Sequence, residues 1–213
     1  MAQDKNPSSD REKLVKRIVE EKGESAIPTL IKLLEDESNE VREIAAQALQ
    51  SFGDAVVEKL MEYLRFKLDN EESFNDVSLL YAADILGELR YKESIPLLYQ
   101  LLEHYDSEVY QLIIYEALAK LGEGEKFLDL LVYFLKEDAF KEELKDQVLM
   151  TLAYIPSERT LKILIDEWYN SENFETKALI LDAIKVLLNG KPELVELLAE
   201  DKNAKQILDE ISF

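Results

Sequence analysis

Carboxylates are the residues with which this chain could do chemistry. The sequence holds 45 acidic and 25 basic residues, one His and no Cys. Because Cys is absent, disulfides, zinc–thiolate sites and cysteine nucleophiles are excluded. Any His-based catalytic centre would have to use His104, which we interpret as a surface residue beside Glu103. We therefore expect no catalytic residue, no bound metal and no cofactor.

Three of the carboxylates occupy one equivalent position of a recurring helical pattern, two residues before an apolar anchor. They are Asp84, Glu116 and Asp182. If the helices stack side by side, these carboxylates form a row with a spacing of about 10 Å, the diameter of a helix. That spacing is too wide for the three side chains to share one metal ion. The row is either a binding surface for a basic segment or a solvated helix face.

Two tyrosines on the same helices, Tyr81 and Tyr115, are candidate partner-binding residues. A tyrosine combines an apolar body with a polar tip, which suits an anchor at a protein interface. Tyr115 aligns with Ala46 and Ala83, so it places a large ring where other repeats carry a methyl group. The alternative for both residues is packing in the core or at its edge.

These residues are positioned by a helix pair that recurs at intervals of 30 to 38 residues. In the first helix of each pair, apolar residues at i, i+3 and i+7 share one helix face. They are Ile27, Leu30, Leu34; Val57, Leu60, Leu64; Ile95, Leu98, Leu102; Leu128, Leu131, Leu135; and Leu161, Leu164, Trp168. The second helices align on Leu49, Leu86, Leu118, Leu152 and Ile184. One pair cannot bury its apolar face alone, so we predict that the pairs stack.

The recurrence also predicts the domain organisation. We expect a disordered tail at 1–9, a leading helix at 10–22, five repeats at 23–53, 54–91, 92–122, 123–156 and 157–190, and C-terminal cap helices at 191–213. Ser9 and Glu12 fit a capping box at the start of the leading helix. Phe74, Phe140 and Phe174 each precede a second helix, where we expect them to pack back as hydrophobic staples. Exposed recognition aromatics are the alternative for these three residues.

The charge balance limits the classes of partner. A net charge of −20 repels nucleic acid and anionic membrane surfaces, and it favours basic partners. The first nine residues are polar, which argues against a secretory signal, and no apolar run approaches the ~20 residues that span a bilayer. We expect a cytoplasmic protein that is a monomer or a weak homo-oligomer and binds neither nucleic acid nor membranes.

The first repeat resembles a HEAT repeat of the short kind found in phycobilin (PBS) lyases. The resemblance is carried by the helix from Ile27-Pro28 to Leu34, by Val41-Arg42, and by Ala48-Leu49 followed by Gly53. It extends in weaker form over residues 24–190. It implies an armadillo-type, right-handed α–α superhelix whose second helices line the concave face. Iron-binding enzymes of this fold need several His-Glu pairs, which a chain with one His cannot supply.

The sequence and the resemblance together predict an all-α solenoid that acts as a non-enzymatic scaffold for protein–protein interaction. We expect a basic or mixed peptide or protein surface to bind the acidic concave face, with Asp84, Glu116, Asp182, Tyr115 and Tyr81 as its contacts. The alternative is a lyase- or hydrolase-type enzyme, or the accessory subunit of one, that uses the carboxylates of the groove.

Overall fold

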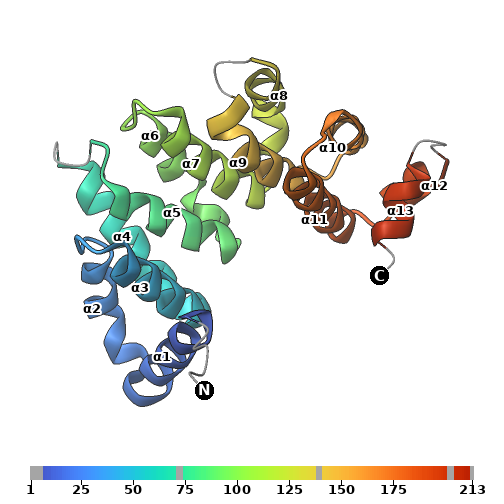
Figure 1. Cartoon of the computed structure of the whole chain (residues 1–213). Helices are drawn as coiled ribbons and strands as arrows, with labels where there is room; N and C mark the ends of the chain where they lie inside the picture. Colours follow the sequence, from blue (N-terminus) through green and yellow to red (C-terminus); the bar gives the residue numbers. More distant parts are fainter. Residues whose placement is uncertain (1–6, 71–73, 138–140, 201–203, 212–213) are drawn as a thin grey trace, which may run out of the picture. The chain divides into compact units, whose positions relative to one another are not determined.

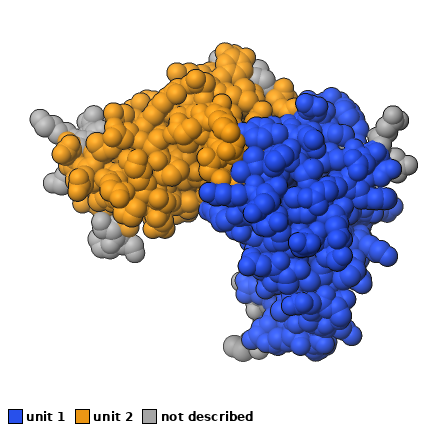
Figure 2. All heavy atoms as spheres, turned by 180° about the vertical axis from the view of Figure 1, so that it is seen from behind, with its two compact units in different colours: residues 1–106 blue, residues 107–213 orange. Residues whose placement is uncertain are grey.

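The structure is a computed structural model that describes residues 7–70, 74–137, 141–200 and 204–211. Within these ranges all regular structure is helical, which confirms the all-α prediction (Figure 1). None of the helices in the same ranges is long and apolar enough to cross a membrane. The chain divides into two compact units, residues 1–106 and 107–213, which are described separately below (Figure 2).

The described residues of unit 1 (7–70 and 74–106) form six α-helices in two layers. They are α1 (Pro7–Lys22), α2 (Ile27–Leu33), α3 (Asn39–Ser51), α4 (Val57–Leu68), α5 (Val77–Glu88) and α6 (Ile95–Leu102). The first layer is formed by α1, α3 and α5, since α3 contacts both of the others. The second layer is formed by α2, α4 and α6, in which α4 contacts both neighbours. Contacts of α2 with α3 and of α4 with α5 join the layers, as stacked helix pairs require (Figure 1).

Unit 2 repeats this arrangement. Its helices are α7 (Glu108–Lys120), α8 (Leu128–Lys136), α9 (Lys141–Ala153), α10 (Glu158–Asn170), α11 (Phe174–Gly190), α12 (Leu194–Glu200) and α13 (Lys205–Ile211). One layer holds α7, α9 and α11, because α9 packs against both neighbours. The other helices cover it: α8 packs on α9 and α10 on α11, while α12 and α13 follow at the C-terminal end.

The apolar anchors read from the sequence form the core of both units. The five anchors of the second helices are all fully buried, with an exposed fraction of 0%. Four of them follow a small residue, namely Ala48, Ala117, Thr151 or Ala183, and these are equally buried. A small side chain at a helix crossing lets two backbones approach closely, which is how the layers pack. The anchors of the first helices are buried too, except that Ile95 and Leu102 are half-buried.

Glycine and proline separate the helices as the pattern indicates. Gly53 and Gly122 follow α3 and α7 with φ of +57° and +93°, a left-handed conformation that glycine adopts without a steric penalty. Pro28 and Pro96 lie in the first turns of α2 and α6, where a missing backbone N–H costs nothing. These residues fix where each helix of a pair begins and ends.

The predicted start of the leading helix is wrong. Helix α1 begins at Pro7, so Ser9 lies inside the helix and cannot be its N-cap. The physical reason is that Pro7 has no backbone N–H and a φ already suited to a first turn. The remainder of the predicted tail, residues 1–6, lies outside the described residues.

The staple interpretation of the phenylalanines is also wrong where the structure describes them. A staple residue directly precedes the N-cap. Phe74 instead lies two residues before the N-cap Asp76, and Phe174 follows the N-cap Asn173 as the first helical residue. Their side chains are therefore exposed, at 54% for Phe74 and 84% for Phe174. Phe140 lies outside the described residues.

Candidate functional site

A hollow of about 470 Å³ lies between α1 and α3 in unit 1. Its lining combines two valines of α1 with polar and charged side chains of both helices. The lining residues are Glu12, Val15, Lys16, Val19, Glu20, Gln47, Gln50 and Ser51. The α1 members follow one another at helical spacing, so a single face of α1 forms this wall.

A second hollow of about 260 Å³ lies between α3 and α5. It is lined by Glu43, Ala46, Gln47, Gln50, Tyr81, Asp84 and Ile85. Gln47 and Gln50 line both hollows, and the two hollows lie on opposite sides of α3. The two hollows therefore adjoin at these two side chains, and we refer to the pair of hollows as the α3 groove.

A chain of polar contacts holds the three walls of the α3 groove together. Arg11 of α1 donates to Glu43 of α3 at 2.5 Å. The other carboxylate oxygen of Glu43 accepts from the amide of Asn39 at 2.7 Å. The hydroxyl of Tyr81 on α5 donates to Oδ1 of Asn39 at 2.9 Å. The positions of the Tyr81 ring and the Glu43 carboxylate are thus fixed before any partner binds.

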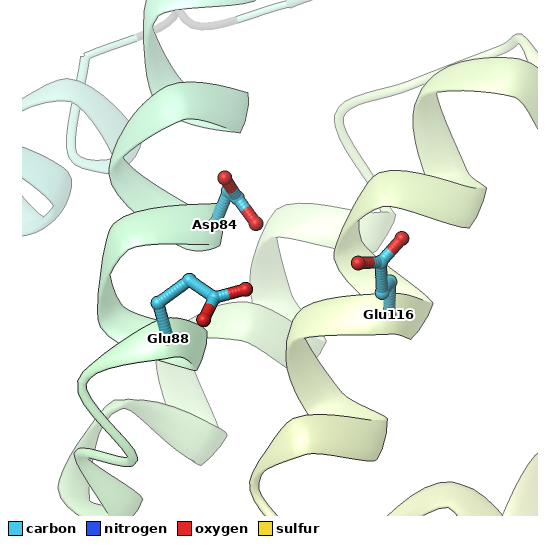
Figure 3. Close-up of side chains that lie close together, drawn as sticks. All are labelled: Asp84, Glu88 and Glu116. Carbon is cyan, nitrogen blue, oxygen red and sulfur yellow. The ribbon is translucent and has the colours of Figure 1, made fainter. Parts of the chain in front are cut away.

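The α3 groove has an acidic lining. Its carboxylates are Glu12, Glu20, Glu43 and Asp84, and its cationic residue is Lys16. Glu88 lies one turn from Asp84 and projects to the same side of α5 (Figure 3), but it is not among the residues that line the groove. Opposite charges attract across such a surface, so the groove favours a cationic ligand over an anionic one.

Of the five residues singled out in the sequence, the structure brings Tyr81 and Asp84 into the α3 groove. The other three belong to unit 2 and are placed by α7 and α11. Glu116 accepts from Gln147 and pairs with Lys120 at 2.7 Å. Lys120 is 5% exposed, and its Nζ lies 5.0 Å from the centre of the Tyr154 ring. An ammonium group this deep needs such partners, because an isolated buried charge is costly.

Tyr115 and Asp182 differ in their surroundings. The Tyr115 ring packs on Phe127 with 4.8 Å between ring centres, and burial raises the pKa of its hydroxyl. Asp182 is exposed and pairs with Lys185 one turn away at 3.0 Å. That Tyr115, Glu116 and Asp182 contact a partner stays a prediction.

A second polar cluster of unit 1 lies at the end of α4. Lys67 pairs with Glu35 at 2.7 Å and with Asp76 at 3.0 Å. The Tyr63 hydroxyl donates to Glu35 at 2.9 Å and lies 2.5 Å from the Ser78 hydroxyl. Because these residues come from the turn after α2, from α4, from the turn before α5 and from α5, the cluster ties successive helix pairs together.

The titration behaviour of this cluster fits a structural role. Burial acts to raise the pKa of Asp76, but hydrogen bonds from Ser78 and Lys67 outweigh burial and the pKa is lowered. Burial likewise acts to lower the pKa of Lys67, and its bonds to Glu35 and Asp76 reverse the effect. Burial raises the pKa of Tyr63. Each group is held in its ordinary charge state, which is unlike an activated acid, base or nucleophile.

Sequence reasoning missed most residues of the α3 groove. Gln47 occupies the same aligned position as Asp84, so the repeat alignment contained a signal for it. Val15 and Val19 lie in the predicted leading helix, but nothing in the sequence shows that this helix forms a wall of a groove. Gln50 carries no feature that separates it from other exposed polar residues.

Comparison with known proteins gives a family and no relative of known role. A family model described as HEAT repeats matches residues 1–72 and again residues 68–142, which together make up more than half of the chain. Among curated proteins, none matches the chain closely enough to count as a relative. The match covers all of unit 1 and therefore every helix that lines the α3 groove.

Proposed function

The chain belongs to the HEAT-repeat family, whose members generally mediate protein–protein interaction, and from this premise we propose that it is a non-enzymatic scaffold that binds a basic protein segment in the α3 groove. The observation that carries the proposal is the groove itself, two adjoining hollows over three helices with four carboxylates and one lysine in their lining. A cytoplasmic location and a monomeric or weakly associating state are part of the same proposal.

The groove suits a protein segment better than a small molecule. Pockets for small molecules usually enclose about 300–1,000 Å³ and are mostly apolar. The α3–α5 half falls below that range at about 260 Å³ and the α1–α3 half falls within it at about 470 Å³, but charged or amide side chains form much of both halves. Two small adjoining hollows on a helical surface match successive side chains of a peptide.

The enzymatic alternative lacks comparable support. Both carboxylate oxygens of Glu43 already accept a hydrogen bond, one from Arg11 and one from Asn39, so this group is engaged in contacts within unit 1. Burial raises the pKa of the Tyr63 hydroxyl, so the hydroxyl ionises less readily and is less suited to act as a nucleophile. We therefore keep the binding function as the conclusion.

The proposal is tested with an array of peptides of equal length and graded net charge, probed with the full-length protein. We expect basic peptides to be retained, and their affinity to fall as salt is raised because exposed charges are screened. Gln50→Lys places a cation in the groove and should weaken binding several-fold. The matched control is Gln100→Lys, the same substitution at an exposed position of α6. A lack of preference for basic peptides, or equal losses in both variants, would contradict the proposal.

A further inference from the structure

We infer that the occupant of the α3 groove is an extended segment that carries one cationic and one aliphatic side chain three residues apart. The inference rests on the proposed function and specifies its partner: the cationic side chain enters the α3–α5 half, the aliphatic side chain enters the α1–α3 half, and the main chain crosses α3 between them.

The crossing point is marked by Gln47 and Gln50. Both side chains are exposed, and neither amide has a hydrogen-bond partner among the described residues. Each amide offers donors and an acceptor, as does a peptide group. A helical segment satisfies its own backbone groups, whereas an extended or polyproline-type segment leaves them open to such partners. The two glutamines therefore favour an extended occupant.

The α3–α5 half has the chemistry of a cation site for a side chain. Glu43, Asp84 and Tyr81 line the same small hollow. A guanidinium or ammonium group there gains charge-assisted hydrogen bonds and an aromatic face. The contact from Tyr81 to Asn39 and the contacts of Glu43 hold two of these groups in place, which lowers the entropy cost of binding.

The α1–α3 half differs because its inner surface contains Val15 and Val19. Val15 is largely buried, and Val19 is half-buried. The charged side chains of Glu12, Lys16 and Glu20 line the same hollow as these valines. An aliphatic side chain that covers the valines removes apolar surface from water. This half therefore selects for an apolar residue.

The distance between the two halves sets the spacing of the two side chains. They lie on opposite sides of α3, so their separation is about the distance between packed helices, roughly 8–10 Å. A polyproline-type segment rises about 3.1 Å per residue and returns to the same side every third residue, after roughly 9 Å. Residues i and i+3 of such a segment match the two halves.

The probes are short fluorescent peptides with the cores Arg-Pro-Pro-Leu and Leu-Pro-Pro-Arg, because the structure does not fix the chain direction. The comparison peptides keep the same composition, but Arg and Leu are one residue apart or five residues apart in the sequence instead of three. At physiological salt we expect one of the two cores to bind at least about fivefold more tightly than the comparison peptides. An alanine-based helical peptide with Arg and Leu at i and i+3 should also bind more weakly.

A coupling measurement assigns the cationic side chain to its half. Replacing Arg by citrulline, which is neutral and of similar shape, should weaken binding to the wild-type protein about tenfold, the effect of losing one charge-assisted hydrogen bond. With Asp84→Asn the two peptides should bind almost equally. Circular dichroism of the variant establishes that it is folded. A tenfold preference for Arg that persists in the folded Asp84→Asn protein overturns the assignment.

The outcomes separate the inference from the proposed function. If basic peptides of every spacing bind equally, the inferred spacing of the cationic and aliphatic side chains is wrong, while the proposed binding of a basic partner stands. If the helical peptide binds as tightly as the polyproline-type cores, the extended conformation is wrong. If no basic peptide binds, the proposed function fails and the inference fails with it.

Discussion

Replacing Lys67 by Met tests whether the cluster at the end of α4 holds unit 1 together. Lys67 bridges Glu35 and Asp76 at 2.7 and 3.0 Å. The side chains of Lys67 and Asp76 are each 20% exposed, and that of Glu35 is 45% exposed. Without the ammonium group, two carboxylates remain close together with no cation between them.

The size of the effect follows from this intermediate burial. Removing one partner of a fully buried ion pair costs about 3–5 kcal/mol, and an exposed pair contributes about 1 kcal/mol or less. Lys67 lies between these limits, so we expect the free energy of unfolding to fall by about 2 kcal/mol. For a chain of this size that corresponds to a decrease in Tm of roughly 4–8 °C.

The assay is urea and thermal unfolding of the full chain, followed by circular dichroism. The matched control is Lys59→Met on the same helix, where Lys59 pairs with Glu62 at 2.7 Å but both side chains are more than half exposed. The control should leave Tm almost unchanged, since water already solvates that pair. Equal shifts in the two variants, or no shift in Lys67→Met, would refute the assignment of a structural role to the cluster.

Acidification tests the same ion pair from the side of the carboxylate, because it protonates Asp76 instead of removing the Lys67 ammonium group. Because its pKa is lowered by folding, Asp76 stabilises the native state above its unfolded pKa, and this contribution disappears as the pH falls through the lower folded value. The difference in stability between wild type and Lys67→Met should therefore shrink below about pH 4. A difference that stays constant down to pH 2 would contradict the ion-pair explanation.

Three further predictions concern stability. Because the pKa of Tyr63 is raised by folding, its contribution to the free energy of unfolding is present below about pH 10 and is lost at higher pH, where the unfolded tyrosine ionises. Tyr63→Phe should therefore make the fall of Tm with rising alkaline pH less steep. Leu118→Ala opens a cavity at a fully buried anchor and should cost about 2–5 kcal/mol in urea unfolding. Phe174→Ser changes a highly exposed ring and should alter the free energy of unfolding by less than about 0.5 kcal/mol in the same assay; a larger loss would mean that Phe174 is packed.

The fold was predictable from the sequence because helical periodicity and burial depend on the same residues. Leu49, Leu86 and Leu118 recur at a constant place in each pair, and each is fully buried in the structure. The boundaries of the five repeats stay a prediction. The start of α1 escaped prediction because two helix-start signals competed, a capping box at Ser9 and a proline at Pro7, and spacing alone does not rank them.

The candidate site was only partly predictable. Tyr81 and Asp84 were found because they lie on an aligned helix face and differ in chemistry from their neighbours. The α1 wall of the groove arises from the packing of α1 on α3, a contact between helices that no local pattern of residues encodes. Phe74 and Phe174 show the same limit, since a shift of one or two residues from the staple position leaves each ring facing solvent.

The most direct test of the central claim is photo-crosslinking from the peptide side. A basic peptide with a diazirine analogue of leucine at its aliphatic position is irradiated with the full-length protein, and mass spectrometry maps the attachment sites. We expect attachment on the α3 groove, at Val15, Val19, Gln47 or Gln50. Attachment confined to α2, α4 or α6, or spread evenly over the surface, would contradict the claim that this groove binds the partner.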